Sequence, residues 1–129
     1  MASINVERIN DDYEFIQYNA HLRIIHSIKD DMYQMQSIIT ACKSNKQAYH
    51  WFENQTTKEL LQEFESQKST LGIPRLEKSY EKRDDVPINL RGYYVHRLLV
   101  NYIAIWVSPT YTIYIAKLLD SQFERERKQ

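Results

Sequence analysis

The chain has 129 residues and equal numbers of basic and acidic side chains, 17 of each, so its formal net charge is zero. A chain of this length forms one domain, 1–129, with a core that needs no disulfide or metal staple. The neutral total excludes an overall basic field that would attract nucleic acid or an anionic membrane. A single cysteine, Cys42, excludes an internal disulfide framework and a cysteine-based zinc site. The first ten residues lack the apolar run of a signal peptide, so we expect an intracellular protein.

The first third of the chain favours short strands. Residues 1–12 are polar with spaced apolar side chains, and they fit a short strand or an ordered arm equally well. Residues 13–18 are strand-like, and apolar and polar side chains partly alternate in 22–28. A polar turn at 29–31 would let 32–35 pair back as a second strand. We therefore predict an N-terminal β-hairpin.

Two helices are predicted next. Residues 37–43 (SIITACK) fit a short helix, and a polar turn and the aromatic segment AYHWF follow it. A second helix over 56–67 begins with a capping box, in which the Thr56 hydroxyl and the Glu59 carboxylate each accept the other residue's backbone N–H. The two helices and the segment between them have the proportions of a helix-turn-helix.

A polar stretch over 68–91 separates these helices from the C-terminal part of the chain. Residues 76–80 and 90–95 could pair as an extended β-hairpin, or wing, with a long tip. Basic residues slightly outnumber acidic ones in this stretch. The wing would therefore carry a weak local positive charge.

The longest apolar stretch, 92–123, predicts two core helices that meet at Ser108 and Pro109. The alternative interpretation of this stretch is a membrane span, but polar residues near 96–101 and the break at the proline argue against it. No membrane partner is therefore expected. The predicted inward face of the first helix is Leu98, Leu99, Tyr102, Ile103 and Trp106. That of the second helix is Tyr111, Ile115, Leu118 and Leu119.

The sequence contains no catalytic motif. It has no glycine-rich phosphate loop and no GxSxG elbow. The spacing of His21, His26, His50 and Cys42 matches no zinc pattern. Cys42 and His50 lack a third residue that would orient a nucleophile–base pair. We therefore expect no enzymatic activity, no metal and no cofactor.

The helix pair and the wing offer a nucleic-acid interface instead. A helix N-terminus has free N–H groups and a partial positive charge, which suit a phosphate, while Asn and Gln can read adenine edges and Lys and Thr can hold phosphates. Alternatively, Thr56 only caps its helix and the lysines are a solvated face. The candidate contacts are Lys43, Lys46, Asn54, Gln55, Thr56, Thr57, Lys58, Lys78, Lys82 and Arg83.

The order of these elements resembles the KilA-N domain of phages and large DNA viruses, such as poxviruses and iridoviruses, which is related to fungal APSES DNA-binding domains. GYYVH at 92–96 and AIWVSP at 104–109 carry the resemblance most specifically, and the segment 51–61 is the second match. It covers about 22–120, the expected core of the domain.

The resemblance implies an α+β fold with an N-terminal β-hairpin, a helix-turn-helix-like pair, a polar wing and two C-terminal core helices. It implies structural roles for Gly92, Trp106, Ser108 and Pro109, and a hydrogen bond from His96 at the start of its helix. Related poxvirus proteins carry a zinc RING domain with ubiquitin-ligase activity, but this chain lacks the Cys and His residues for one.

Two functions follow as hypotheses. The first is a non-enzymatic viral module that binds double-stranded DNA, with RNA as a competing ligand, inside an infected host cell. The second is a regulatory protein that uses its tyrosine-rich helices for a protein partner or a homodimer, because Tyr is favoured at interfaces. The tyrosines concerned are Tyr93, Tyr94, Tyr111 and Tyr114.

Overall fold

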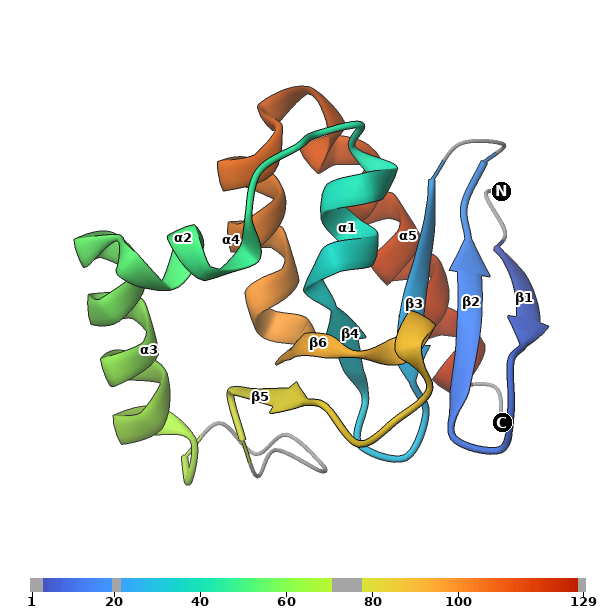
Figure 1. Cartoon of the computed structure of the whole chain (residues 1–129), viewed down its shortest axis with the longest axis horizontal. Helices are drawn as coiled ribbons and strands as arrows, with labels where there is room; N and C mark the ends of the chain where they lie inside the picture. Colours follow the sequence, from blue (N-terminus) through green and yellow to red (C-terminus); the bar gives the residue numbers. More distant parts are fainter. Residues whose placement is uncertain (1–3, 20–21, 71–77, 128–129) are drawn as a thin grey trace.

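The computed structural model describes residues 4–19, 22–70 and 78–127, and it confirms the α+β class. One antiparallel sheet has six strands in the order β1-β2-β3-β4-β6-β5 (Figure 1). The strands are β1 (Asn5–Arg8), β2 (Tyr13–Gln17), β3 (Arg23–Ser27), β4 (Met32–Gln34), β5 (Tyr80–Arg83) and β6 (Gly92–His96). The helices are α1 (Met35–Ala41), α2 (Ala48–Glu53), α3 (Gln55–Gln67), α4 (Arg97–Val107) and α5 (Pro109–Arg127), with a short 3-10 helix, η1 (Ile88–Leu90).

The N-terminal hairpin is confirmed as β3 and β4, and β1 decides the open alternative at the N-terminus in favour of a strand. The polar hairpin also forms, but it is part of the main sheet, because β6 pairs with β4 on one side and with β5 on the other. Of the predicted strand 76–80, residues 76 and 77 lie outside the described residues, while Lys78 and Ser79 are not in a strand and β5 begins only at Tyr80. The expected wing is therefore the edge of a continuous sheet.

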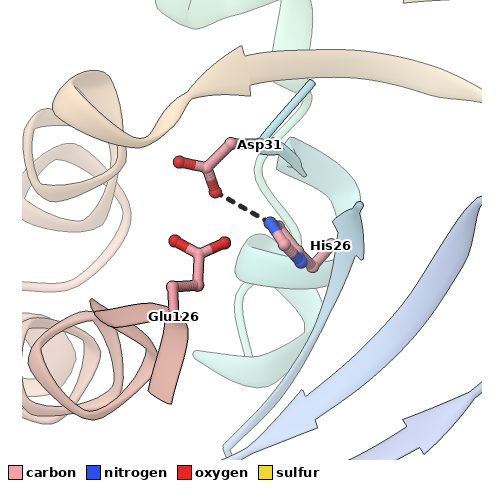
Figure 2. A group of neighbouring side chains, drawn as sticks. All are labelled: His26, Asp31 and Glu126. Carbon is pink, nitrogen blue, oxygen red and sulfur yellow. Dashed lines mark hydrogen bonds and ion pairs between the residues drawn. The ribbon is translucent and has the colours of Figure 1, made fainter. Parts of the chain in front are cut away.

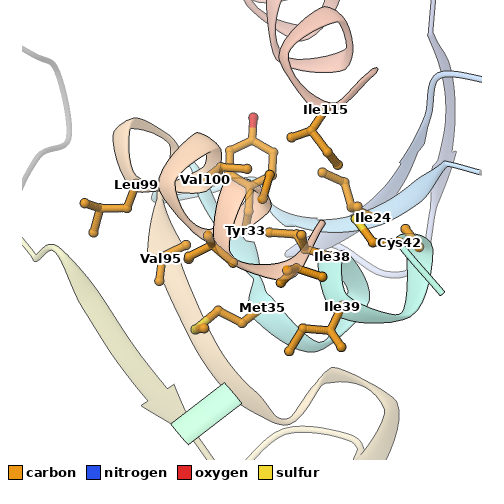
Figure 3. Packing of buried hydrophobic residues seen from close by; sticks show 14 of the residues in the cluster. Ile24, Tyr33, Met35, Ile38, Ile39, Cys42, Val95, Leu99, Val100 and Ile115 are labelled. Atoms are coloured by element: carbon orange, nitrogen blue, oxygen red, sulfur yellow. The ribbon is translucent and has the colours of Figure 1, made fainter. Parts of the chain in front are cut away.

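The main core lies between the sheet and the helices α1, α4 and α5 (Figure 3). Strands contribute Ile24, Tyr33 and Val95 to it, and the predicted inward residues Ile38 and Ile39 of α1 are fully buried. A smaller apolar cluster covers the opposite face of the sheet, with Tyr13, Ile25, Met32, Leu90 and Tyr94 as its buried members. Both faces of the central strands are therefore covered.

The predicted inward face of α4 is only half right. Leu99 and Ile103 are buried, but Tyr102 is 52% exposed and Leu98 is 39% exposed. The buried face of α4 is Leu99, Val100, Ile103, Ala104 and Val107. This helix is apolar on nearly every side, so its period alone does not select the inward face. The selection is made by β6, which leads directly into α4 and fixes how the helix is turned against the sheet.

The junctions around α4 agree with the sequence. His96 precedes the helix, and its Nδ1 accepts the backbone N–H of Leu98 at 3.3 Å, the hydrogen bond that the resemblance implies. The helix ends at Val107, and α5 begins at Pro109 as predicted. Ile115 and Leu118 of α5 are fully buried.

The prediction of a capping box at Thr56 is wrong. Helix α3 begins one residue earlier than predicted, at Gln55, so Asn54 occupies the N-cap and Thr56 already lies inside the helix. The extra helix α2 lies between α1 and α3, so the two predicted helices do not follow one another directly. The preceding helix that packs against α3 is therefore α2, which the aromatic segment forms.

Within the described residues, no helix has both the length and the apolar character needed to cross a membrane.

Candidate nucleic-acid interface

A groove of about 420 Å³ lies between the N-terminal end of α3 and the exposed face of α4. Its walls come from α2, from the first turns of α3 and from the last turns of α4. Because α4 lies far from α2 and α3 in the sequence, no local pattern predicts that these helices form one groove. Both tryptophans of the chain, Trp51 and Trp106, line it. The other lining residues are Asn54, Gln55, Thr56, Thr57, Leu60, Tyr102 and Ile105. Four of the predicted contact residues are thus gathered at one place.

The N-terminal end of α3 has unused hydrogen-bonding capacity. Asn54 has the backbone geometry of an N-cap, yet its side chain caps nothing, and the first backbone bond of the helix is from Lys58 N–H to the Asn54 carbonyl at 3.1 Å. Within the described part of the chain, the side chains of Gln55, Thr56 and Thr57 make no hydrogen bond, although Thr57 is only 3% exposed. The first N–H groups of a helix have no acceptor within it, so this end offers donors to a ligand.

Three of the predicted lysines, Lys43, Lys46 and Lys58, precede or begin α3 in the sequence. One of them, Lys46, contacts a residue that lines the groove. The ammonium of Lys46 donates to the Trp106 carbonyl at 2.9 Å and lies 4.8 Å from the centre of that indole ring. Lys58 is exposed in the first turns of α3, and Lys43 is exposed just after α1. Neither Lys43 nor Lys58 lines the groove itself.

Aromatic rings connect the groove to the β5–β6 hairpin. The ring of Trp51 lies 5.1 Å from that of Phe52, which lies 4.7 Å from that of Tyr93. The Lys82 ammonium lies 5.8 Å from the centre of the Tyr93 ring, and Tyr80 also stacks on Phe52. This row of rings places the exposed Lys82 on the side of the sheet that faces α2.

Arg83 is not a surface residue, which corrects its place among the candidate contacts. Its guanidinium donates to Ser27 at 2.8 Å, to Glu81 at 2.8 Å and to Asp30, and only 7% of the residue is exposed. Burial alone would lower the pKa of Arg83, but the hydrogen bond to Glu81 and the charge of Asp30 outweigh it and raise that pKa. Successive side chains of a strand point to opposite faces, so Arg83 is buried while Lys82 is exposed.

The remaining charges near the interface are mixed. Lys78 pairs with Glu81 at 2.7 Å at the surface of the hairpin, so part of its charge is already compensated. The exposed side of α3 carries Glu59 next to Lys58, and it carries Glu63 and Glu65 further along the helix. A phosphate backbone would be repelled along the length of this helix and attracted only at its N-terminal end.

A second polar cluster lies away from the groove, where the side chains of His26, Asp31 and Glu126 meet (Figure 2). The ring nitrogens of His26 lie 2.8 Å from Asp31 and 2.8 Å from Glu14. Arg97 lies 3.3 Å from Asp31 and 3.4 Å from Glu126. Each acid therefore already has a cationic partner, so these groups form an ion network that ties β3, α4 and α5 together.

Of the other candidates for metal or nucleophile chemistry, His50 and Cys42 do not join this cluster. His21 lies outside the described residues. His50 is exposed and pairs with Glu53 at 3.1 Å. Cys42 is buried in the main core, and burial raises the pKa of its thiol to about 11, which keeps it protonated and unreactive at neutral pH.

Comparison with known protein families matches residues 16–124 to the KilA-N domain. The chain is also 31% identical, over 120 residues, to a KilA-N domain-containing protein of Acanthamoeba polyphaga mimivirus. That alignment covers 89% of this chain and 32% of the mimivirus protein, so the chain spans about a third of the length of this curated relative. No solved structure matches the chain.

Proposed function

The chain belongs to the KilA-N domain family, a DNA-binding type of domain in viral proteins, and on this basis we propose that it binds double-stranded DNA without catalysing a reaction. The observation that carries the proposal to particular residues is the N-terminal end of α3, with its unused N–H groups and side chains. The proposed setting is the interior of an infected host cell.

The charges indicate how the duplex would approach. Helix α3 would meet the DNA end-on, because its N-terminal end favours phosphate while its later turns carry exposed glutamates. Lys46 and Lys58 would hold phosphates, and Lys43 would add a more distant charge. Asn54 and Gln55 have the amide groups that pair with adenine edges.

The hairpin would add Lys82 to this contact through its place beside α2. Lys78 would contribute less, because Glu81 already neutralises much of its charge. Arg83 is left out of the proposed interface since its guanidinium is buried. The contact is therefore small and dominated by phosphates.

Fluorescence anisotropy with a labelled random-sequence duplex across a salt series tests the proposal. Above about 20 mM salt, the logarithm of the binding constant should fall linearly with the logarithm of salt concentration, with a slope that counts the phosphate contacts. The triple variant K46Q/K58Q/K82Q should bind more weakly and lose about three contacts, or about 2.7 from the slope.

The matched control removes the same three charges elsewhere. R8Q/K29Q/K117Q alters exposed cations of β1, of the turn before β4 and of α5, and it should keep the wild-type slope. If the two triple variants lost equal duplex affinity and equal salt slope, only the net charge of the protein would matter for binding, which would contradict this interface. Absence of duplex binding at low salt would contradict the proposed function.

One observation favours a second function, the binding of a protein partner or a second copy. Helices α4 and α5 expose large apolar side chains, among them Tyr102, Ile105, Ile113 and Tyr114, each at least 43% exposed. Tyr94 is fully buried, so it is not part of this surface. A dimer at low concentration in analytical ultracentrifugation, together with no DNA binding, would favour this function.

A further inference from the structure

We propose that the groove between α3 and α4 receives one unpaired nucleobase, so that the protein prefers single-stranded or locally opened DNA to an intact duplex. This inference rests on the proposed function and names the form of DNA that the same interface selects.

The groove has the size and the lining of a small-ligand site. Its volume of about 420 Å³ lies within the range of roughly 300–1,000 Å³ that is usual for ligand pockets. Tyr102 and Trp106 offer aromatic rings, and Leu60 and Ile105 add aliphatic contact. Aromatic side chains that stack on bases are the recurrent means of holding single-stranded nucleic acid, because every base has a π-face.

The polar wall of the groove suits the edge of a base. Thr57 lines it and is buried, and its hydroxyl has no hydrogen-bond partner in the part of the chain that the structure describes. Asn54 and Gln55 line the same wall with amide groups that make no side-chain hydrogen bond there either. Amides both donate and accept, as the Watson–Crick edge of an unpaired base requires.

The charges at the rim suit the phosphates on either side of that base. The Lys46 ammonium lies next to Trp106, and Lys58 is one turn into α3. The 13-residue helix α3 directs its positive end to the same place. An apolar peptide or a second copy of this chain would use the rings of the groove but would leave the amides and the positive rim without partners.

An intact duplex cannot supply a base to this groove unless that base leaves its stack. Unstacking and unpairing cost free energy, and the cost is smallest where the base is already mismatched or single-stranded. Binding should therefore be tighter to a thymidine oligonucleotide than to a duplex of the same length. The phosphate contacts of the rim are common to both ligands.

The tryptophans make the groove directly observable, because the chain has two and both line it. The experiment follows tryptophan emission, excited at wavelengths where thymine does not absorb, during titration with a 12-residue thymidine oligonucleotide and with a 12-base-pair duplex. Anisotropy of labelled copies of both ligands is measured in parallel. The test variant is Tyr102→Ala, and the control is Tyr114→Ala, which removes a comparably exposed tyrosine outside the groove.

The expected result is quenching by the oligonucleotide, tighter binding of the oligonucleotide than of the duplex, and about tenfold weaker oligonucleotide binding by Tyr102→Ala. Tyr114→Ala should behave as wild type, and the duplex salt slope should be the same in all three proteins. Oligonucleotide binding without any change in tryptophan emission, oligonucleotide binding no tighter than duplex binding, or equal effects of the two variants would overturn the groove assignment and leave the proposed function standing. Absence of binding to both ligands would overturn both.

Discussion

Replacing His26 with Leu is expected to destabilise the fold strongly. The imidazole is 1% exposed, and its two nitrogens lie 2.8 Å from the carboxylates of Glu14 and Asp31. Leucine has a similar volume and no polar atom, so the substitution removes both interactions and leaves two buried acids. Glu14 would keep Arg125 at 2.6 Å, and Asp31 would keep Arg97 at 3.3 Å.

The size of the effect follows from these remaining partners. Removing one member of a buried ion pair costs roughly 3–5 kcal/mol because an uncompensated charge stays behind. Since each carboxylate near His26 keeps an arginine, we expect the low end of this range, about 3 kcal/mol. The matched control is His50→Leu. His50 and Glu53 form an exposed pair, and such pairs contribute at most about 1 kcal/mol.

The network also predicts how stability depends on pH. Burial alone would lower the pKa of His26, but the hydrogen bonds to Asp31 and Glu14 outweigh it, so the pKa is raised above its ordinary value of 6.5. The stabilisation is then complete below pH 6.5 and is lost as the pH rises through the folded-state pKa. For Glu14, burial opposes the hydrogen bond from His26, and the pKa is lowered below 4.5, so its contribution is lost as the pH falls toward that pKa.

Urea unfolding followed by tryptophan emission measures these effects in wild type, His26→Leu and His50→Leu at pH 6 and at several higher values. The difference between wild type and His26→Leu should be largest near pH 6 and should shrink at higher pH. The difference for His50→Leu should stay small. If the two variants lost equal stability, or if the His26 effect grew with pH, the assignment of a protonated imidazole between two carboxylates would be refuted.

Three further predictions concern individual residues. Arg83→Met should lose about 2–3 kcal/mol of unfolding free energy, because it leaves the acids that face Arg83 without their donor. Its low-salt duplex affinity, measured by anisotropy, should be unchanged, and a loss of affinity in the folded variant would return Arg83 to the interface. Gly92→Ala should lose about 1–2 kcal/mol in the same urea assay, since Gly92 has φ +114 while an added Cβ would meet no atom within 4 Å; no loss would contradict a conformational cost. The Cys42 thiol, whose pKa burial raises to about 11, should react with a thiol reagent at pH 8 only after unfolding in urea, and rapid reaction of the native protein would contradict its burial.

Elements with a clear local pattern could be predicted from the sequence. Partial alternation identified the β3–β4 hairpin, and helical spacing identified α1 with Ile38 and Ile39 inward. Pro109 marked the start of α5. In each case a rule about neighbouring residues is sufficient: strand-forming residues flank a polar turn, apolar residues recur at helical spacing, or the backbone of a proline is restricted.

The candidate site could be predicted only in part. The polar residues at the start of α3 were found, but the groove also needs Trp51 and Trp106 to line it together, and these two residues lie far apart in the sequence. Because α4 is apolar on nearly every side, its sequence does not show that Tyr102 faces outward. Arg83 and Lys82 are adjacent and similar, and only strand pairing shows which of them is buried. The strongest overlooked signal was the apolar excess of α4, which exceeds what one buried face requires.

The neutral total charge by itself argues against the proposed DNA binding, but the short range of electrostatic forces in salt makes the local arrangement of charges more important. Helix α3 has 13 residues and is therefore about 20 Å long, whereas exposed charges are screened over about 8 Å at physiological salt. A phosphate at the N-terminal end would then sense Lys58 and the helix dipole but little of Glu63 and Glu65. At 10 mM salt the screening length reaches about 30 Å, so the repulsion from these glutamates should be felt. We therefore expect the salt plot of duplex binding to flatten below about 20 mM, and E63Q/E65Q to restore a straight line; an equally flat plot for that variant would show that the charge pattern along α3 does not shape binding.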